Sequence, residues 1–387
     1  MTAALIKGEA GVCAVVSDQT TEGNDRTPGY RNRRLKILGQ DEIEEIYGLP
    51  RFSDEERELY FSLTPSEEAA IIEELHSTKS KTAFILQLGY FKARRMFFIF
   101  TAKDVTADLN YVANQYFPDT ADPDCTISKR TRLKHQRLIL ALYKYTICSD
   151  SDRQYLEVKA REAAMVSGKP IYVFRQILLE FEARRLTVPG YSFLQDTVSQ
   201  ALIFEQNRLA GILKKQLTLS NRQAFNELLD EKSGLYHLTH LKRDPRDFSA
   251  TEIKREIARG AQIRDLYMLS QQMLPALEIS NESIKYYASL VGYYSVFRLK
   301  RFEPRTVYIY LLCFIYHRYQ QCYDNLLVSF IFHVRKFVDA AKAVAKERVY
   351  EYRVEANQNL RKAAKVLRLF TTEEIDGDAP FYEVGCV

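Results

Sequence analysis

Helix-initiation motifs recur along this chain, and they constrain its fold more than any other feature of the sequence. Ser53-Asp54-Glu55-Glu56 is a capping box, in which the Ser53 hydroxyl accepts from a free backbone N–H and Glu56 reaches back to the cap. Thr64-Pro65-Ser66-Glu67 repeats the motif, with proline at the first helical position, where no N–H is needed. Strand-like alternation of apolar and polar residues is scarce. The sequence therefore predicts a mainly α protein.

Apolar side chains spaced three or four residues apart predict further helices along the chain. The turn Val188-Pro189-Gly190-Tyr191 is a clear break between two of them. After the first third of the chain, the predicted helices cover residues 171–185, 193–215, 284–296, 305–320, 325–353 and 355–370. We expect several small helical bundles, at 31–150 and 151–250, followed by a region of long helices at 251–387. Residues 1–30 lack periodicity and predict a disordered leader.

Acidic and basic side chains are sorted into separate blocks in the first third of the chain. Carboxylates crowd residues 41–74, whereas 75–103 and 125–148 contain Lys and Arg but no Asp or Glu. The net charge of +5 decides little, but this local sorting favours a polyanionic partner, and nucleic acid is the obvious one. The residues that we predict to contact DNA are Lys79, Lys81, Lys92, Arg94, Arg95, Lys129, Arg130, Arg132, Lys134, His135 and Arg137.

Each charged block also has a structural explanation. Arg94 and Arg95 lie near the end of a predicted helix, where cations complement the helix dipole. The basic residues at 129–137 lie at a helix start, where they oppose the dipole, and a bound phosphate would offset this effect. Such a helix is suited to the major groove. The acidic residues at 41–74 are best explained as helix-initiating residues rather than as a catalytic or metal cluster.

Several motifs, in the same order along the chain, resemble a known family. They include Arg130-Thr-Arg-Leu-Lys-His135 and the Pro-Gly-Tyr turn at 189–191 before a long helix. The stretches that carry the likeness are 47–64, 84–90, 130–135, 182–194, 324–336 and 355–370. Together they resemble the Tn3 family of replicative transposases, from about residue 35 to about residue 383. In that family, the first of these regions is catalogued as an N-terminal domain of unknown function.

The resemblance implies a DNA-binding portion of a transposase and leaves enzymatic activity open. Family members catalyse DNA strand transfer with Mg²⁺ through an Asp-Asp-Glu triad in a C-terminal ribonuclease-H-like region. No residue here matches that triad, so we assign no catalytic residue and no cofactor to this chain. The ending Gly385-Cys386-Val387 also departs from the family pattern. We interpret it as a frameshift, an interrupted gene or a designed fragment.

Cysteine, histidine and tyrosine are better explained by packing than by chemistry. The six cysteines form no Cys-x-x-Cys pair, which fits a reducing cytoplasm. Cys313, His317 and Cys322 lack a fourth zinc ligand and lie among apolar residues, so a buried core is the better interpretation. His237 and His240 are a weak pair in a loop-like region. Tyrosines crowd residues 286–323, where we favour packing and subunit contact over base stacking.

Three hypotheses follow. The first is a DNA-binding module that recognises the terminal inverted repeats of a transposable element, through domains at 31–150 and 151–250. The second is a truncated regulator that pairs with a full-length relative, with self-association through 284–370. The third is an inactive gene remnant. We expect double-stranded DNA as the partner and a bacterial cytoplasmic, nucleoid-associated protein. We expect no membrane span, because the longest apolar run, 307–316, is too short to cross a bilayer.

Overall fold

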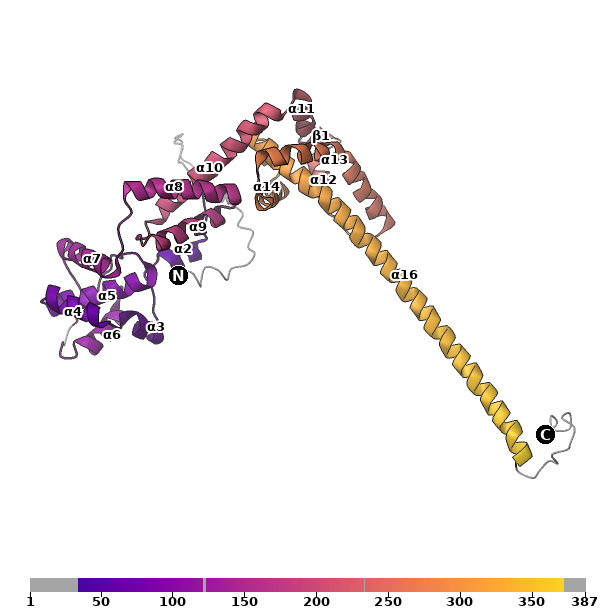
Figure 1. Cartoon of the computed structure of the whole chain (residues 1–387), viewed down its shortest axis with the longest axis horizontal. Coiled ribbons are helices and arrows are strands. Elements are labelled where there is room, and N and C mark those ends of the chain that lie inside the picture. Colours follow the sequence, from indigo (N-terminus) through magenta and orange to yellow (C-terminus); the bar gives the residue numbers. More distant parts are fainter. Residues whose placement is uncertain (1–33, 121–122, 233, 372–387) are drawn as a thin grey trace.

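Helices dominate the computed structural model, which describes residues 34–120, 123–232 and 234–371. Within these ranges the paired strands are β1 (Glu231–Lys232) and β2 (Leu235–Tyr236), which form one short antiparallel hairpin. The prediction of a mainly α protein is confirmed. The leader expected at 1–30 and the ending at 385–387 lie outside the described residues. Figure 1 shows packed helices at one end of the molecule and a long helix that extends away from them.

The first of three hydrophobic cores is built around one central helix. Its helices are α3 (Asp54–Phe61), α4 (Pro65–Glu74), α5 (Thr78–Arg94), α6 (Thr106–Tyr116) and α7 (Lys129–Tyr143). Residues 82–91 of α5 are all buried, which places this helix at the centre. Beside it, the Tyr90 hydroxyl donates to Asp108 at 2.7 Å, and Arg57 donates to the same carboxylate at 2.8 Å. A buried carboxylate is thereby satisfied by two donors.

Both predicted capping boxes are present. The Ser53 hydroxyl accepts from the Glu56 N–H, and the Glu56 carboxylate accepts from the Ser53 N–H at 2.9 Å. Thr64 and Glu67 repeat this arrangement at the start of α4, where Pro65 occupies the first turn. The interpretation of these acidic residues as helix-initiating residues is confirmed.

The second core is built from two segments far apart in sequence. Its helices are α2 (Gln40–Tyr47), α8 (Asp150–Val166), α9 (Pro170–Ala183) and the first half of α10 (Tyr191–Gln216). The backbone N–H groups of Ile37 and Leu38 donate to the Tyr191 hydroxyl at 3.2 and 3.0 Å. Thr146 pairs through its backbone with Arg185 and Thr187, at 3.0 Å each, and so joins the end of the first core to the second.

The third core takes its residues from Leu209 to Ile315. Its elements are the second half of α10, α11 (Leu219–Leu228), the hairpin, α12 (His237–Leu241), α13 (Ala250–Leu277), α14 (Asn281–Tyr293), α15 (Val296–Leu299) and the start of α16 (Pro304–Thr371). The predicted domain boundary near residue 250 lies inside this range. Because α10 contributes to both cores, it joins the second to the third as one continuous helix (Figure 1).

Buried side chains in and beside the third core confirm the packing predicted for Cys313, Cys322 and several of the tyrosines, whereas Tyr293 and Tyr323 are exposed. Cys313 and Cys322 are 0% and 1% exposed, and burial raises the pKa of the Cys322 thiol to about 12. Tyr287, Tyr294 and Tyr310 are buried in the same region. No cluster of three or more potential metal ligands occurs among the described residues. None of the described helices is both long and apolar enough for a bilayer span.

The prediction of three helices between residues 305 and 370 is wrong, because the structure has one continuous helix, α16. Its 68 residues span about 100 Å at 1.5 Å per residue. No glycine or proline follows Pro304 until Gly377, so nothing in the chain breaks the helix. The two predicted breaks, at 321–324 and at 354, lie within this helix, and every residue from 334 to 368 is exposed.

Candidate nucleic-acid interface

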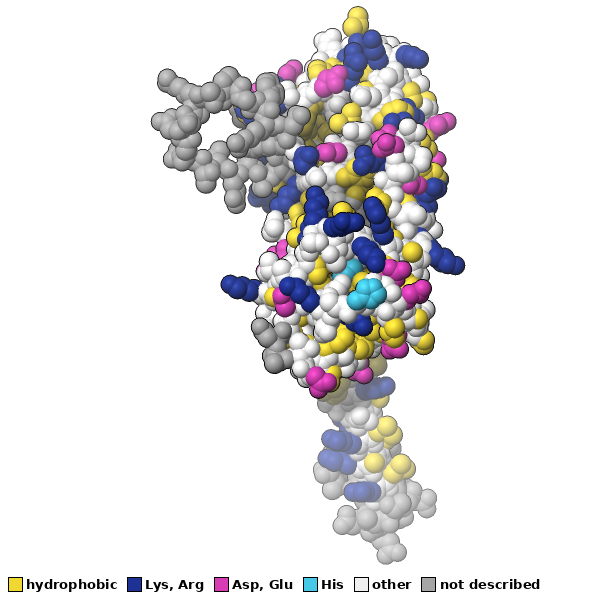
Figure 2. All heavy atoms as spheres, turned by 90° about the vertical axis from the view of Figure 1, so that its left-hand side faces the viewer, with side chains coloured by type: hydrophobic (Ala, Val, Ile, Leu, Met, Phe, Trp, Pro, Cys, Tyr) yellow, Lys and Arg dark blue, Asp and Glu magenta, His cyan; other side chains and the backbone are white. Residues whose placement is uncertain are grey.

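The solvent face of α7 combines exposed cations with a complete lack of carboxylates. Arg130, Lys134 and Arg137 follow one another at helical spacing and are all exposed, while His135 and Ile139 face the core. No Asp or Glu occurs between residues 129 and 143. Figure 2 faces the end of the molecule that carries the first core and shows Lys and Arg side chains gathered near the middle of this surface. Exposed cations on a helix that carries no acid of its own suit a phosphate backbone.

The eleven predicted residues differ in how free their charges are. Lys129, Arg130 and Arg137 are exposed, while Arg132, Lys81 and Arg94 are half-buried. Among the described residues, no ion-pair partner is found for these six. Two others are exposed but paired: Lys79 with Asp124 at 2.6 Å and Lys134 with Glu74 at 2.8 Å. Such exposed pairs are weak, so both lysines remain available to a phosphate.

Lys92 takes part in a buried network instead of facing solvent. Its ammonium group lies 3.0 Å from the Glu67 carboxylate, which is 2% exposed, and donates to the Ser62 carbonyl at 2.7 Å. Burial alone would raise the pKa of Glu67, but donors from Tyr143, Thr64 and Lys92 hold it below its ordinary value. Lys92 therefore has a structural role that leaves its charge already balanced.

His135 is buried in the first core, and Arg95 is half-buried against its aromatic rings. The His135 ring is 0% exposed and its Nε2 lies 2.9 Å from the Ser80 hydroxyl. Burial, with a smaller effect from Lys134, lowers the pKa of His135 to about 4. The Arg95 guanidinium stacks on the rings of Phe91, Tyr143 and Tyr145 at 5.6–5.8 Å. We leave His135, Arg95 and Lys92 out of the proposed interface.

The fold divides the first predicted basic cluster between the two ends of α5. The contact of Ser80 with His135 brings the start of α5 beside the middle of α7. Arg94 and Arg95 lie at the other end of α5, whose 17 residues span about 25 Å. The cations nearest to one another are therefore those on α7, with Lys81 from the start of α5. We call the surface formed by Lys129, Arg130, Arg132 and Arg137 the α7 surface.

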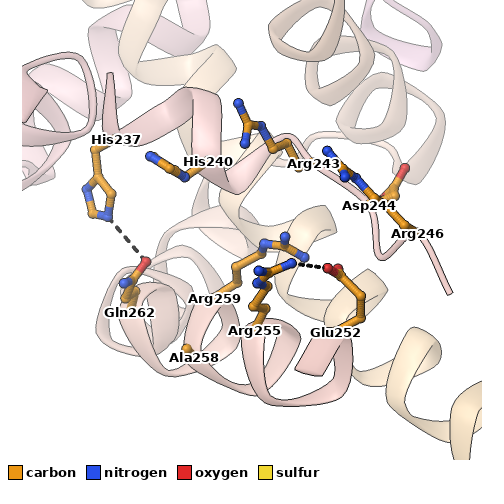
Figure 3. Close-up of a pocket in the computed structure, with 10 residues that line it drawn as sticks. All are labelled: His237, His240, Arg243, Asp244, Arg246, Glu252, Arg255, Ala258, Arg259 and Gln262. Carbon is orange, nitrogen blue, oxygen red and sulfur yellow. Dashed lines mark hydrogen bonds and ion pairs between the residues drawn. The ribbon is translucent and has the colours of Figure 1, made fainter. Parts of the chain in front are cut away.

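A second basic region, which was not predicted, is a hollow of about 890 Å³ on the third core. Figure 3 shows that it is lined from two sides, by α12 with the loop after it and by the first turns of α13. We call it the arginine hollow. Its lining residues are His237, His240, Arg243, Asp244, Arg246, Glu252, Arg255, Ala258, Arg259 and Gln262.

A buried arginine holds the two sides of the arginine hollow together. Arg318 of α16 is 2% exposed and donates to the backbone carbonyls of Leu241 and Arg243 at 2.6 and 2.7 Å. The same guanidinium lies 2.9 Å from Asp244 and 3.1 Å from Glu256. Since Leu241 to Asp244 lie on one side and Glu256 on the other, Arg318 fixes the width of the hollow.

A local signal for the arginine hollow was present in the sequence, but it was ambiguous. Lys242, Arg243 and Arg246 form a short basic run, and Arg255 and Arg259 are four residues apart. Nothing local distinguishes Lys242, which donates to the Tyr294 carbonyl at 2.6 Å, from its neighbours that line the hollow. Burial lowers the pKa of the Lys242 ammonium to about 8. The run becomes a site only when α13 is packed against it.

The fold and these surfaces define a helical protein with two separate basic regions. Residues 37–201 match the model of a domain of unknown function (DUF4158), a domain found in the N-terminal region of Tn3-family transposases. The matched range begins at Ile37 and ends beside Leu202, so it coincides with the first and second cores taken together. The α7 surface lies within the match and the arginine hollow lies outside it. No curated protein sequence matches the chain.

Proposed function

We propose that the protein binds double-stranded DNA through the α7 surface, as the DNA-binding portion of a Tn3-like transposase that recognises terminal inverted repeats. The observation that carries this proposal is the exposed, acid-free face of α7. Lys129, Arg130 and Arg132 lie in its first turn, where cations oppose the helix dipole. A bound phosphate removes this unfavourable interaction. Such a protein would act at the bacterial nucleoid.

The match of residues 37–201 supports the proposal independently of the charges. The domain that it identifies occurs with transposases, which act on DNA. The α7 surface is also rigidly placed, because the Ser128 hydroxyl caps the first turn of α7 and the buried His135 ring lies 2.9 Å from the Ser80 hydroxyl of α5. A rigid, exposed helix start fits the geometry by which many proteins enter the major groove.

The test is fluorescence anisotropy with a labelled duplex that ends in the inverted repeat of a Tn3-family element. Arg130→Gln with Arg137→Gln removes two exposed charges without removing a partner from the core. If both contact phosphates, the slope of log K against log salt becomes shallower by about 1.8 between about 50 and 200 mM KCl. A scrambled duplex of the same composition separates backbone contact from sequence recognition.

A matched control removes the same charge elsewhere. Lys214→Gln with Lys215→Gln changes two exposed lysines at the end of α10, far along the chain from the α7 surface. We expect this control to change the slope much less. Equal slopes for the two double variants would contradict the proposal, and equal affinity for both duplexes would remove the inverted repeat from it.

We also propose self-association through α16, because this helix carries an apolar stripe with nothing packed on it among the described residues. Most of the apolar residues from 327 to 367 recur at steps of three or four and so fall on one face. The stripe begins with Leu327, Ile331, Val334, Val338, Ala341 and Ala345. A stripe of 41 residues is about 60 Å long, and the same helix of a second copy has the matching length.

Light scattering across a range of protein concentrations tests this second proposal. We expect a dimer that Ile331→Asp with Val338→Asp converts into a monomer, because a charge placed on the apolar stripe loses its hydration when the helices pair. Arg335→Asp, an exposed substitution in the same segment, serves as the control. A wild-type monomer at every concentration would contradict self-association.

A further inference from the structure

The arginine hollow has an excess of positive charge that the protein does not neutralise. Arg243 and Arg246 are exposed and form no ion pair with any described residue. Arg255 and Arg259 each pair through one nitrogen, with Glu252 and with Glu256. Counting Arg318, five guanidinium groups meet the carboxylates of Asp244, Glu252 and Glu256, and Asp247 adds a fourth carboxylate near Arg246 and Arg255, which leaves one positive charge.

The hydrogen-bonding capacity of the arginine hollow is also incompletely used. A guanidinium carries five N–H donors, and the ion pairs of Arg255 and Arg259 use only some of them. Glu252 and Glu256 are buried, at 5% and 1% exposure, and their carboxylates pair with Arg255 and Arg259. These buried carboxylates therefore orient the two arginine side chains. The donors that remain on Arg243, Arg246, Arg255 and Arg259 are free to bind a ligand.

The support beneath the arginine hollow makes this a prearranged site. Arg318 and Glu256 are both buried, and Asn325 donates to Glu256 at 2.9 Å. At one end of the hollow, the His237 Nε2 and the Gln262 side-chain oxygen lie 3.3 Å apart and link α12 to α13. These contacts fix the lining residues before a ligand binds. Binding therefore does not carry the entropic cost of ordering the loop after α12.

The chemistry of the lining indicates the class of ligand. Arginine forks match the geometry of phosphate oxygens and bind them through paired hydrogen bonds. Four of the ten residues that line the hollow are arginines, so cationic donors dominate its polar groups. The excess charge lies in a concave surface, where the field of several cations is concentrated. We propose that the arginine hollow binds consecutive phosphates of a nucleic-acid backbone.

This site extends the DNA binding proposed above, but it stands on its own geometry. It lies on the third core, outside residues 37–201, whereas the α7 surface lies on the first core. Substitutions at one site are therefore expected to leave binding at the other site unchanged. Variants of the α7 surface report on the proposed function, and variants of the hollow report on this inference.

The experiment measures binding of a labelled single-stranded oligonucleotide to the full chain that already carries Arg130→Gln and Arg137→Gln. Adding Arg243→Gln with Arg246→Gln is expected to weaken binding about tenfold at low salt and to reduce the salt slope by about 1.4, because each phosphate contact on a single strand contributes about 0.7. Arg243→Lys with Arg246→Lys keeps the charges, and we expect it to restore most of the slope but not the full affinity. Lys214→Gln with Lys215→Gln is the charge-matched control.

Two results would overturn the inference. One is that the Arg243→Gln and Arg246→Gln pair weakens binding no more than the control at Lys214 and Lys215. The other comes from inorganic triphosphate, measured by calorimetry: if it binds at the hollow while the oligonucleotide is unaffected by the same variants, the ligand is a free phosphate compound and not a nucleic-acid backbone. Unchanged thermal unfolding of the variants shows that the fold is intact.

Discussion

Replacing Arg318 by methionine tests whether a buried guanidinium holds the third core together. The side chain is 2% exposed and makes hydrogen bonds to two carbonyls and two carboxylates at 2.6–3.2 Å. Removing one partner of a buried ion pair costs about 3–5 kcal/mol. Glu256 keeps its bonds from Arg259 and Asn325, which reduces the cost. The carbonyls of Leu241 and Arg243 lose their donor, which adds to it.

We therefore expect Arg318→Met to lower the free energy of unfolding by about 3–5 kcal/mol. Arg318→Lys keeps the charge, but an ammonium group cannot reach four acceptors arranged around a planar fork, so an intermediate loss is expected. Arg335→Met, on an exposed part of α16, is the control, and its effect should stay within about 0.5 kcal/mol.

Urea denaturation followed by circular dichroism measures the loss, and hydrogen exchange locates it. Residues 237–262 should exchange faster in Arg318→Met, because the bonds that hold the two sides of the arginine hollow are gone. The first core should keep its protection. A loss below about 1 kcal/mol, or faster exchange spread evenly over all three cores, would refute the role of Arg318 as the link between α12 and α13.

Two further substitutions examine the first core. Glu67→Gln leaves the Lys92 ammonium without its buried partner. We expect the free energy of unfolding, measured in urea, to fall by about 3 kcal/mol. Since its pKa is lowered in the folded protein, Glu67 stabilises above its ordinary pKa, and this stability is lost as the pH falls through the folded value. Urea titrations at neutral and acidic pH should show this loss in the wild type and not in the variant; parallel pH dependence would contradict it. Gly89→Ala places a Cβ 2.4 Å from two atoms of the Phe61 ring, so we expect a lower thermal midpoint, with a cost of about 1–3 kcal/mol. A midpoint equal to the wild type would show that the ring moves freely.

Much of the local structure could be predicted, because helix starts depend on residues that are neighbours in sequence. The capping boxes at Ser53 and Thr64 lie where the sequence indicated. Apolar spacing predicts three helices between residues 305 and 370, whereas α16 is continuous. A helix without glycine or proline can continue where its apolar spacing is interrupted.

The candidate sites could be predicted less well. Sequence identified α7 as basic, but it could not separate Arg130, which faces solvent, from His135, which faces the core, without knowing the packing of α5. The run from Lys242 to Arg246 carries no distinguishing local signal, since Arg255 and Arg318, which complete the site, lie on α13 and α16. A site made from three elements has no signature in any one of them.

The sequence alone determined the mainly α fold, the caps that start its helices and the two acid-free segments of the first third. These follow from hydrogen bonds and charges within a few residues of one another. The tertiary structure alone decided which cations are free. It buried Lys92 against Glu67, exposed the face of α7 and brought α12, α13 and α16 together around the arginine hollow. Burial and ion pairing are set by contacts between distant residues, and only folding brings those residues together.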